Sequence, residues 1–390
     1  MANKQQTSYS LQQLVAYAFK LGATGFGGPV ALVGYMLRDL VEQRKWISEA
    51  DYREGLALAQ LAPGPLAAQL AIYLGYVDYR ILGATLVGLA FVLPSFFMVV
   101  VLGWLYTLYG GLDWMQAVFY GVGASVIGII AFSAYKLTLK TLGKNKLLWG
   151  VYLVLAAFTA ITESENIYLI LAGGLLVWFV EHPPLRMKSA LSGAAGFLAL
   201  PLAVTPPSAA SDQTILWKIF IFFAKAGTFV FGSGLAIVPF LYGGVVKEHQ
   251  WLNNHQFLDA VAVAMITPGP VVITVGFIGY LVAGFPGACL AALGTFLPCY
   301  LFTVIPAPYF KKYGKQPAIL SFVNGITAAA VGAITGAVIV LGRKSIIDIP
   351  TALLAVVTAG ILWKTKKVPE PVMIVVAAAI GLVVKLGGHL

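Results

Sequence analysis

The strongest constraint on the fold of this chain is an internal duplication. Residues 19–35 read FKLGATGFGGPVALVGY and residues 224–240 read AKAGTFVFGSGLAIVPF, and placing Phe26 on Phe231 gives an offset of 205 residues, the difference between 26 and 231. The same offset superposes Lys20 on Lys225, Gly22 on Gly227, Trp46 on Trp251, and Glu54 on Asp259. After one deletion, the offset becomes 204, and Gly121 and Gly128 then meet Gly325 and Gly332. A register held this far indicates two copies of one unit.

The environment of both copies follows from their apolar content. Hydrophobic residues make up 59% of the chain and charged residues only 10%, whereas a soluble domain carries about 25% charged residues. Apolar stretches long enough to cross about 30 Å of hydrocarbon recur from end to end. They lie near 11–41, 54–75, 82–108, 116–137, 147–162, 167–181, 189–204, 215–246, 257–282, 285–306, 317–341, 350–363 and 371–388. We therefore expect an all-α polytopic membrane protein, and the polar start MANKQQTSYS shows no removable signal peptide.

The order of these segments predicts that the two repeats have inverted topology. The first repeat starts at the first segment and the second at the eighth, so an odd number of crossings reverses the second copy if each segment crosses once. The Pro-rich and polar stretch between the copies is the expected linker. The predicted organisation is a repeat over 1–204, a linker over 205–214 and an inverted repeat over 215–390.

Basic loops predict the orientation, because cytoplasmic loops are enriched in lysine and arginine. Four basic loops fall on the side of the N-terminus, at 136–146, 186–188, 311–315 and 364–367. The loop that carries Arg38, Arg44, Lys45 and Arg53 would lie outside. The conflict disappears if 11–41 and 54–75 are re-entrant hairpins and their copies dip in from the other face. The alternative is four full, kinked spans and one loop that breaks the rule.

Two glycine-rich motifs interrupt equivalent apolar segments. FGGP occupies 26–29 and FGSG occupies 231–234. Such breaks free backbone groups that hydrocarbon cannot satisfy, so they persist where backbone lines a cavity, and the following half-helix offers N–H donors to an anion. Close helix packing through small residues is the alternative. The candidate site residues here are Gly27, Gly28, Pro29, Gly232, Ser233 and Gly234.

The triplets Pro63-Gly64-Pro65 and Pro268-Gly269-Pro270 are a more specific signal. Proline lacks the N–H and clashes with the preceding turn, so two in three residues end a helix. A plain kink needs only one proline, which favours a hairpin tip or an unwound centre. The polar side chains expected beside the triplets are Gln60, Gln69, Thr267 and Thr274.

Two pairs of equivalent charges complete the candidate site. Lys20 and Lys225 lie inside apolar stretches, each shortly before its glycine break. A cation at such a place faces a cavity or a partner, or else it snorkels to the interface. Glu54 and Asp259 are either helix N-terminal residues favoured by the dipole or groups that couple transport to protons or ion pairs.

Other classes of function lack support in the sequence. The net charge of +10 comes from short loops rather than from one basic face, which argues against nucleic-acid binding. Cys289, Cys299 and four scattered histidines show no metal or disulfide spacing. We find no nucleotide-binding loop or nucleophile elbow, so neither an enzyme nor a cofactor is expected. Trp104, Tyr106, Tyr109 and Trp114 are expected to form an interfacial belt.

Taken together, these motifs resemble the chromate ion transporter family, in particular its long two-repeat members. The resemblance is carried by Lys20-Leu21-Gly22, FGGP, Trp46, Ala62–Pro65, Gly75-Tyr76 and Leu93-Pro94. It implies export of chromate, a sulfate-like oxyanion, across the inner membrane of a prokaryote, and resistance to chromate. FGSG in the second copy departs from the family pattern.

The function that these features predict is a secondary transporter for a tetrahedral dianion. The alternatives are a carrier for sulfate or another anion, and an anion channel on the same scaffold. An intramembrane enzyme or lipid-handling protein lacks a recognisable acid–base set. The expected partners are chromate or a related oxyanion and the lipid bilayer, with a proton, a counter-anion or a second copy in a homodimer as further options.

Overall fold

The computed structural model describes residues 9–26, 28–109, 113–163, 167–182, 211–228, 237–313, 316–365 and 370–387, together with residues 230 and 368. All regular structure in these ranges is helical, which confirms the predicted all-α class. Segment 189–204 and most of the predicted linker lie outside the described residues. The boundaries of the two repeats therefore stay a prediction.

The helices of the first half recur in the same order in the second half, which also contains the short elements η5 and α12. The first half contains α1 (Leu11–Thr24), α2 (Gly28–Met36), the π-helix η1 (Leu37–Gln43), α3 (Glu49–Leu61), α4 (Leu66–Tyr109), α5 (Asp113–Leu142), α6 (Lys146–Thr162) and α7 (Ile167–Glu181). The second half contains α8 (Ser211–Gly227), α9 (Ile237–Leu241), the π-helix η4 (Tyr242–Glu248), α10 (Asn254–Ile266), the 3₁₀ turn η5 (Val271–Ile273), α11 (Thr274–Val304), α12 (Ala307–Tyr313), α13 (Pro317–Ser345), α14 (Ile349–Lys364) and α15 (Glu370–Gly387). The duplication thus includes even the two π-helices, a rare element.

A sharp turn divides α4, and another divides α11, into two arms each. Arg80 has φ 55° and ψ −141°, and Gly284 has φ 61° and ψ −155° at the equivalent position. Each turn folds the second arm back along the first, so that a Cβ on Gly83 would overlap the carbonyl oxygen of Gly75. Glycine permits this close approach of two backbones.

Each half of the molecule packs its last two helices against the other half. α5 packs against α14 and α15, and α13 packs against α6 and α7. A side chain on Gly121 would overlap the carbonyl oxygen of Ala377, and one on Gly332 would overlap that of Tyr152. The paired glycines found in the sequence therefore allow close contact between the repeats.

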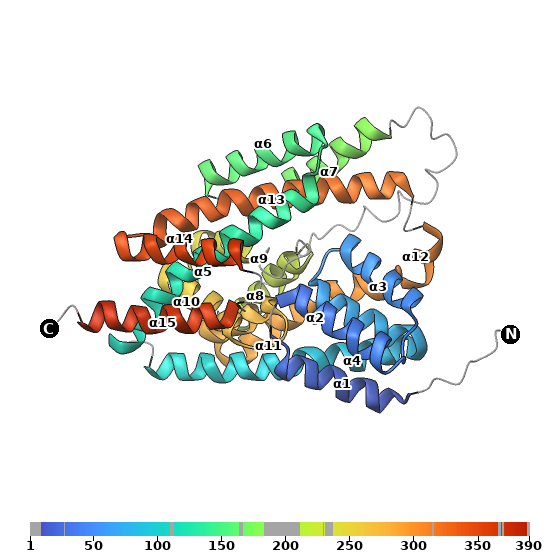
Figure 1. Cartoon of the computed structure of the whole chain (residues 1–390), viewed down its shortest axis with the longest axis horizontal. Helices are drawn as coiled ribbons and strands as arrows, with labels where there is room; N and C mark the ends of the chain where they lie inside the picture. Colours follow the sequence, from blue (N-terminus) through green and yellow to red (C-terminus); the bar gives the residue numbers. More distant parts are fainter. Residues whose placement is uncertain are drawn as a thin grey trace.

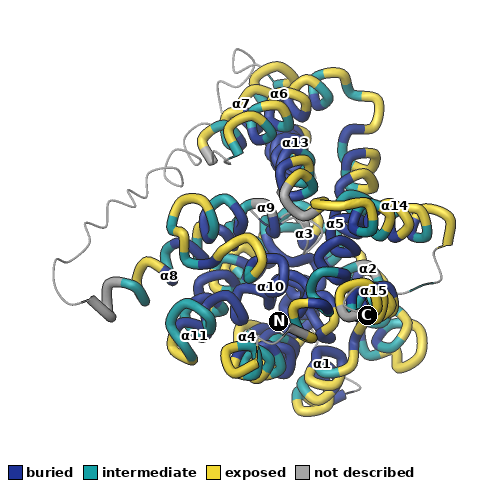
Figure 2. Tube along the Cα trace, turned by 90° about the vertical axis from the view of Figure 1, so that its left-hand side faces the viewer, coloured by how far each residue is buried: buried dark blue, intermediate teal, exposed yellow. Residues whose placement is uncertain are grey.

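The two repeats run in opposite directions. In Figure 1, α13 begins beside α12 at the right and ends toward the left, whereas α5 rises from the lower left toward α6 at the upper right. This opposition agrees with the inverted topology that the segment order predicts. Buried residues gather along the inner faces of the helices, and exposed residues lie on the outer faces of peripheral helices such as α6 and α14 (Figure 2).

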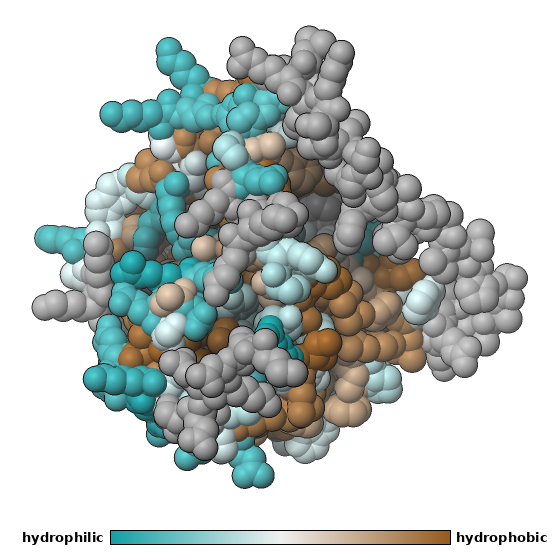
Figure 3. Space-filling view, turned by 90° about the vertical axis from the view of Figure 1, so that its right-hand side faces the viewer, coloured by the Kyte–Doolittle hydropathy of each residue, from teal (hydrophilic) through white to brown (hydrophobic). Residues whose placement is uncertain are grey.

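The outer surface fits a lipid environment. Among the described residues, four helical stretches are long and apolar enough to cross a membrane: Leu66–Tyr109, Trp114–Leu142, Val271–Phe310 and Pro317–Arg343. The second arm of α4 exposes an apolar stripe that consists of Leu82, Leu86, Leu89, Leu93 and Phe97. Figure 3 views the molecule from the right of Figure 1 and shows hydrophilic side chains over much of this end, with hydrophobic ones beside them. The structure is that of a polytopic membrane protein.

Candidate functional site

The predicted breaks separate helices at equivalent places in both repeats. α1 ends at Thr24 and α2 begins at Gly28, while α8 ends at Gly227 and α9 begins at Ile237. The two Pro-Gly-Pro triplets lie between α3 and α4 and between α10 and η5. Gly27 and the FGSG residues Gly232, Ser233 and Gly234 lie outside the described residues. The remaining break residues confirm that these helices are interrupted.

The breaks of one repeat bind the breaks of the other. The Gly64 N–H donates to the Val230 carbonyl oxygen at 2.5 Å, and the Gly269 N–H donates to the Gly25 carbonyl oxygen at 2.9 Å. Gly64 is equivalent to Gly269, and Gly25 is equivalent to Val230. The two bonds are therefore copies of each other about a pseudo-twofold axis. They join each Pro-Gly-Pro triplet to the glycine break of the other repeat, and these two joined pairs of segments form the centre of the candidate site.

The tip of the second triplet is tightly enclosed. Gly269 has φ 93°, a conformation that L residues rarely adopt. A Cβ at this position would overlap the Ser95 hydroxyl oxygen, which itself donates to the Gly22 carbonyl oxygen at 3.2 Å. Glycine is thus required here both by the backbone and by the space.

The polar side chain at the first triplet is Gln69 rather than Gln60. Gln69 is fully buried, and its Nε2 donates to the Pro63 carbonyl oxygen at 2.8 Å. Its Oε1 has no hydrogen-bond partner among the described residues, which leaves one acceptor free beside the tip. Gln60 is exposed at the other side of the break. A buried acceptor in this state is a place for a bound water or a ligand hydroxyl.

The helices that follow the triplets present their N-terminal turns at this centre. α4 starts directly after Pro65, and η5 starts directly after Pro270 and leads into α11. The first N–H groups of a helix have no intrahelical acceptor, and the helix dipole favours negative charge there. The arrangement can therefore hold an anion with backbone donors.

Lys20 and Lys225 are not buried at this centre. Each lies exposed in the last turns of its helix, α1 or α8, just before the break. The Lys20 carbonyl oxygen accepts from the Thr24 hydroxyl at 2.8 Å, and the Lys225 carbonyl oxygen accepts from the Thr228 hydroxyl at 2.6 Å. The structure thus places the two cations on the surface of the helices that lead into the site.

The equivalent acids have different surroundings. Asp259 is 3% exposed and accepts a hydrogen bond from the Tyr106 hydroxyl at 2.7 Å. Glu54 is half-buried and accepts from the Tyr73 hydroxyl at 2.8 Å. Tyr73 belongs to the repeat of Glu54, whereas Tyr106 reaches Asp259 from the other repeat. Tyr106 is therefore an internal partner, and its expected place in the interfacial belt is wrong.

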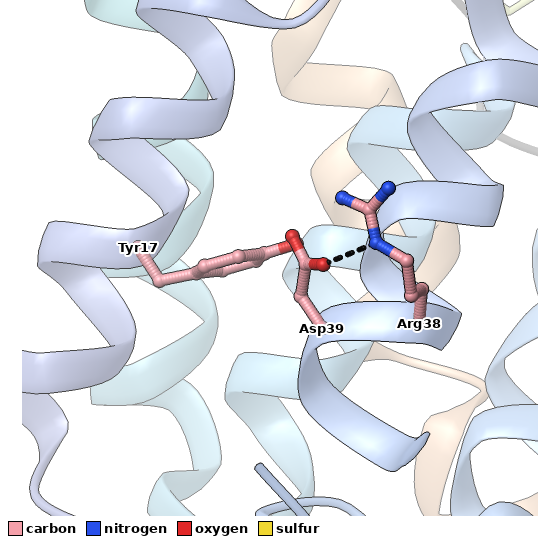
Figure 4. Close-up of polar contacts among 3 residues, drawn as sticks. All are labelled: Tyr17, Arg38 and Asp39. Atoms are coloured by element: carbon pink, nitrogen blue, oxygen red, sulfur yellow. Dashed lines mark hydrogen bonds and ion pairs between the residues drawn. The ribbon is translucent and has the colours of Figure 1, made fainter. Parts of the chain in front are cut away.

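A polar cluster near α1 occurs in the first repeat alone. The Arg38 Nε lies 2.8 Å from one carboxylate oxygen of Asp39, and the Tyr17 hydroxyl donates to the other at 3.3 Å (Figure 4). The equivalent residues in the second repeat are Gly243, Gly244 and Phe222. Sequence comparison of the copies shows this difference, but only the structure shows that the three side chains meet.

Known proteins share this pattern of two repeats. The profile of the family described as "Chromate transporter" matches residues 12–178 and again residues 217–382. The "Chromate transport protein" of Cupriavidus metallidurans is 70% identical over 96% of this chain and 94% of its own length. That of Pseudomonas aeruginosa is 30% identical over 95% of this chain and 91% of its own length.

A shorter relative matches a single repeat. The "Uncharacterized transporter YwrA" of Bacillus subtilis is 28% identical over 43% of this chain and 96% of its own length. No solved structure is significantly similar to this chain. The names of the relatives point to a transporter rather than an enzyme. With both repeats matched, the chain belongs to the chromate transporter family.

Proposed function

We propose that this protein is a secondary transporter that exports chromate across the inner membrane of a prokaryote and so confers resistance to chromate. The observation that carries the proposal is the reciprocal pairing of Gly64 with Val230 and of Gly269 with Gly25. Interrupted helices that meet at the interface of inverted repeats are the plan of many alternating-access carriers. The substrate is proposed from family membership and from the names of the full-length relatives.

In this proposal, a tetrahedral dianion lies where the four interrupted segments meet. Backbone N–H groups at the starts of α4 and η5 donate to its oxygens, because these donors have no intrahelical acceptor. Lys20 and Lys225 attract the anion from the surfaces of α1 and α8. The remaining proposed site residues are Gly27, Gly28, Pro29, Pro63, Gly64, Pro65, Gly232, Ser233, Gly234, Pro268, Gly269 and Pro270.

The driving force is proposed to combine the membrane potential with an exchanged ion. A potential that is negative inside favours expulsion of a dianion by about 2.3 kcal/mol per charge per 100 mV. We propose Asp259 as the group that carries a coupled proton. Its charged form is costly to bury, and the salt bridges of the described residues do not include it. Sulfate as a counter-anion and a homodimer are the further parts of the proposal.

Chromate uptake by the purified protein tests the proposal. In proteoliposomes, we expect uptake that saturates with chromate concentration and is inhibited by sulfate, because one central site is occupied in each cycle. Flux that rises linearly with concentration and follows the potential alone would instead indicate a channel. Sulfate uptake that far exceeds chromate uptake would assign the site to sulfate. Empty liposomes and liposomes that contain the heat-denatured protein serve as controls.

The same vesicles test proton coupling. With an imposed proton gradient, wild-type uptake should change several-fold, and Asp259→Asn should remove this response while retaining basal uptake. Glu54→Gln is the matched control, because Glu54 is half-buried and so can ionise with less cost. An unchanged response in Asp259→Asn would exclude Asp259 as the coupling group.

A further inference from the structure

One face of α8 carries two lysines with an aromatic ring between them. Lys218, Phe222 and Lys225 are spaced at i, i+4 and i+7, which places their side chains on the same face of the helix. Both lysines are exposed, whereas Phe222 is buried. The face therefore presents two positive charges on either side of an apolar centre.

The His249 side chain packs against Phe222. The residue follows η4, and its imidazole ring contacts the Phe222 ring edge-on, with 5.5 Å between centroids and 90° between planes. The imidazole also stacks on the Trp251 ring, with 4.5 Å between centroids and 19° between planes. The half-buried imidazole therefore packs on the ring that separates the two lysines along α8.

The surroundings of His249 disfavour the protonated form of its imidazole. Partial burial lowers the pKa of His249, Glu248 on the neighbouring position raises it, and Lys218 and Lys225 lower it. The other nearby charge on η4, Lys247, is paired with Glu163 at 2.5 Å. Free imidazole has a pKa of about 6.5. These surroundings therefore favour the neutral form of His249 more than free solution does, and negative charge beside it would favour the protonated form.

The first repeat has a related cluster, in which Gln13 replaces the first lysine and the permanent charge of Arg44 replaces His249. Gln13, Tyr17 and Lys20 occupy the equivalent face of α1, and the Arg44 guanidinium lies 5.6 Å from the centre of the Tyr17 ring. Arg44 also lies 4.5 Å from the centre of the Trp46 ring, as His249 stacks on the equivalent Trp251. The first repeat thus holds an arginine at the position where the second repeat holds a histidine that can gain or lose its charge.

We propose that Lys218, Lys225 and His249 form a subsite for a tetrahedral oxyanion at the entrance of the second repeat, and that His249 binds a proton together with the anion. The proposal rests on the proposed transport function for the identity of the physiological anion. Sulfate and a phospholipid phosphate share the chemistry that the three cations recognise. A free oxyanion is favoured, because a lysine and a basic side chain on an aromatic cluster recur beside the broken helix of each repeat.

The linkage between proton and anion has a definite sign. A bound dianion stabilises protonated His249, so sulfate raises the pKa of this imidazole. Binding is strongest below the pKa of the sulfate-free protein and weakens as the pH rises through the pKa of the sulfate-bound form. A rise of one pH unit in the midpoint corresponds to a tenfold difference in sulfate affinity between acidic and alkaline conditions.

The experiment follows the histidine signals of the full-length protein by NMR, with ¹³C-labelled imidazoles in neutral detergent. His249→Gln assigns the signal. We expect saturating sulfate to raise the titration midpoint of His249 by about half a pH unit or more. The paired substitution Lys218→Gln and Lys225→Gln should remove this rise. The signal of the exposed His255 serves as the control and should not respond to sulfate.

The outcomes separate the subsite from the transport function. A sulfate-dependent rise that is lost in the lysine variant supports the subsite, even if the chromate uptake assay fails. Normal chromate uptake without such a rise overturns the subsite alone. Nanodiscs that contain phosphatidylglycerol but no sulfate provide the second arm. A rise that occurs only in these nanodiscs would assign the cluster to a lipid headgroup and overturn the proposal.

Discussion

Gly269→Ala is expected to lower chromate flux by about tenfold or more. At φ 93° an alanine costs about 1–3 kcal/mol of backbone strain. Its Cβ would also overlap the Ser95 hydroxyl oxygen, so the triplet must move. Movement of the triplet breaks the hydrogen bond from the Gly269 N–H to the Gly25 carbonyl oxygen, which joins the two repeats. The measurement is the initial rate of chromate uptake per mole of reconstituted protein.

Two further variants show whether the cause lies at the tip. Gly34→Ala, at an exposed position of α2, adds a methyl group where no atom lies within 4 Å and should keep wild-type flux. Adding Ser95→Ala to Gly269→Ala removes the overlapping oxygen and should restore part of the flux. Wild-type flux in Gly269→Ala would mean that the pairing of the breaks is not needed for transport.

Lys20→Gln is expected to abolish chromate export in inverted vesicles while the protein stays inserted in the membrane. Lys20 lies in the α1 turn that leads into the first break, and it is exposed rather than buried in a salt bridge. Loss of its charge should therefore weaken the attraction and binding of an anion and should change the stability of the fold little. Lys20→Arg keeps the charge and should retain a large part of the activity.

The control for this substitution is a lysine away from the breaks. Lys136 on α5 is exposed and lies 5.4 Å from the Phe132 ring centre, so Lys136→Gln removes an equal charge from another surface. We expect its export rate to remain close to that of wild type. Undiminished export by Lys20→Gln would exclude Lys20 from the transport mechanism.

The sequence predicts most of the architecture. Apolar length and low charge indicate a helical membrane protein, and the offset of 205 residues relates the breaks, the triplets and the acids of the two repeats. Glycine and proline leave a clear local signal because they change the backbone itself. The positions of the described breaks were therefore predictable.

Contacts between the copies were not predictable in the same way. Equivalence shows that Gly64 corresponds to Gly269, but it does not show that each binds the opposite repeat. The packing of α13 on α6 and α7 was unpredictable for the same reason. The glycines of α13 could accept a helix from either copy, so the sequence does not identify the packing partner. Such choices depend on the three-dimensional arrangement of whole helices.

Side-chain direction accounts for the other differences. Gln60 and Gln69 flank the same triplet, yet Gln69 folds back onto Pro63 and Gln60 faces outward. Tyr106 near the end of α4 has the sequence position of a belt residue, but it reaches Asp259. The direction of each side chain around its own helix decides these cases, and this direction depends on how the helices pack.

The most direct test of the central claim asks whether an oxyanion protects the paired breaks from chemical modification. Ala62 precedes the first triplet and is half-buried, and Ala50 lies exposed at the other end of α3. Each is changed to cysteine in a Cys289→Ser background, with Cys299 left buried. The rate of modification by a charged, water-soluble thiol reagent is then measured with and without sulfate. We predict that sulfate slows modification at position 62 several-fold and leaves position 50 unchanged; equal rates at position 62 with and without sulfate would contradict an anion site at the meeting point of the two repeats.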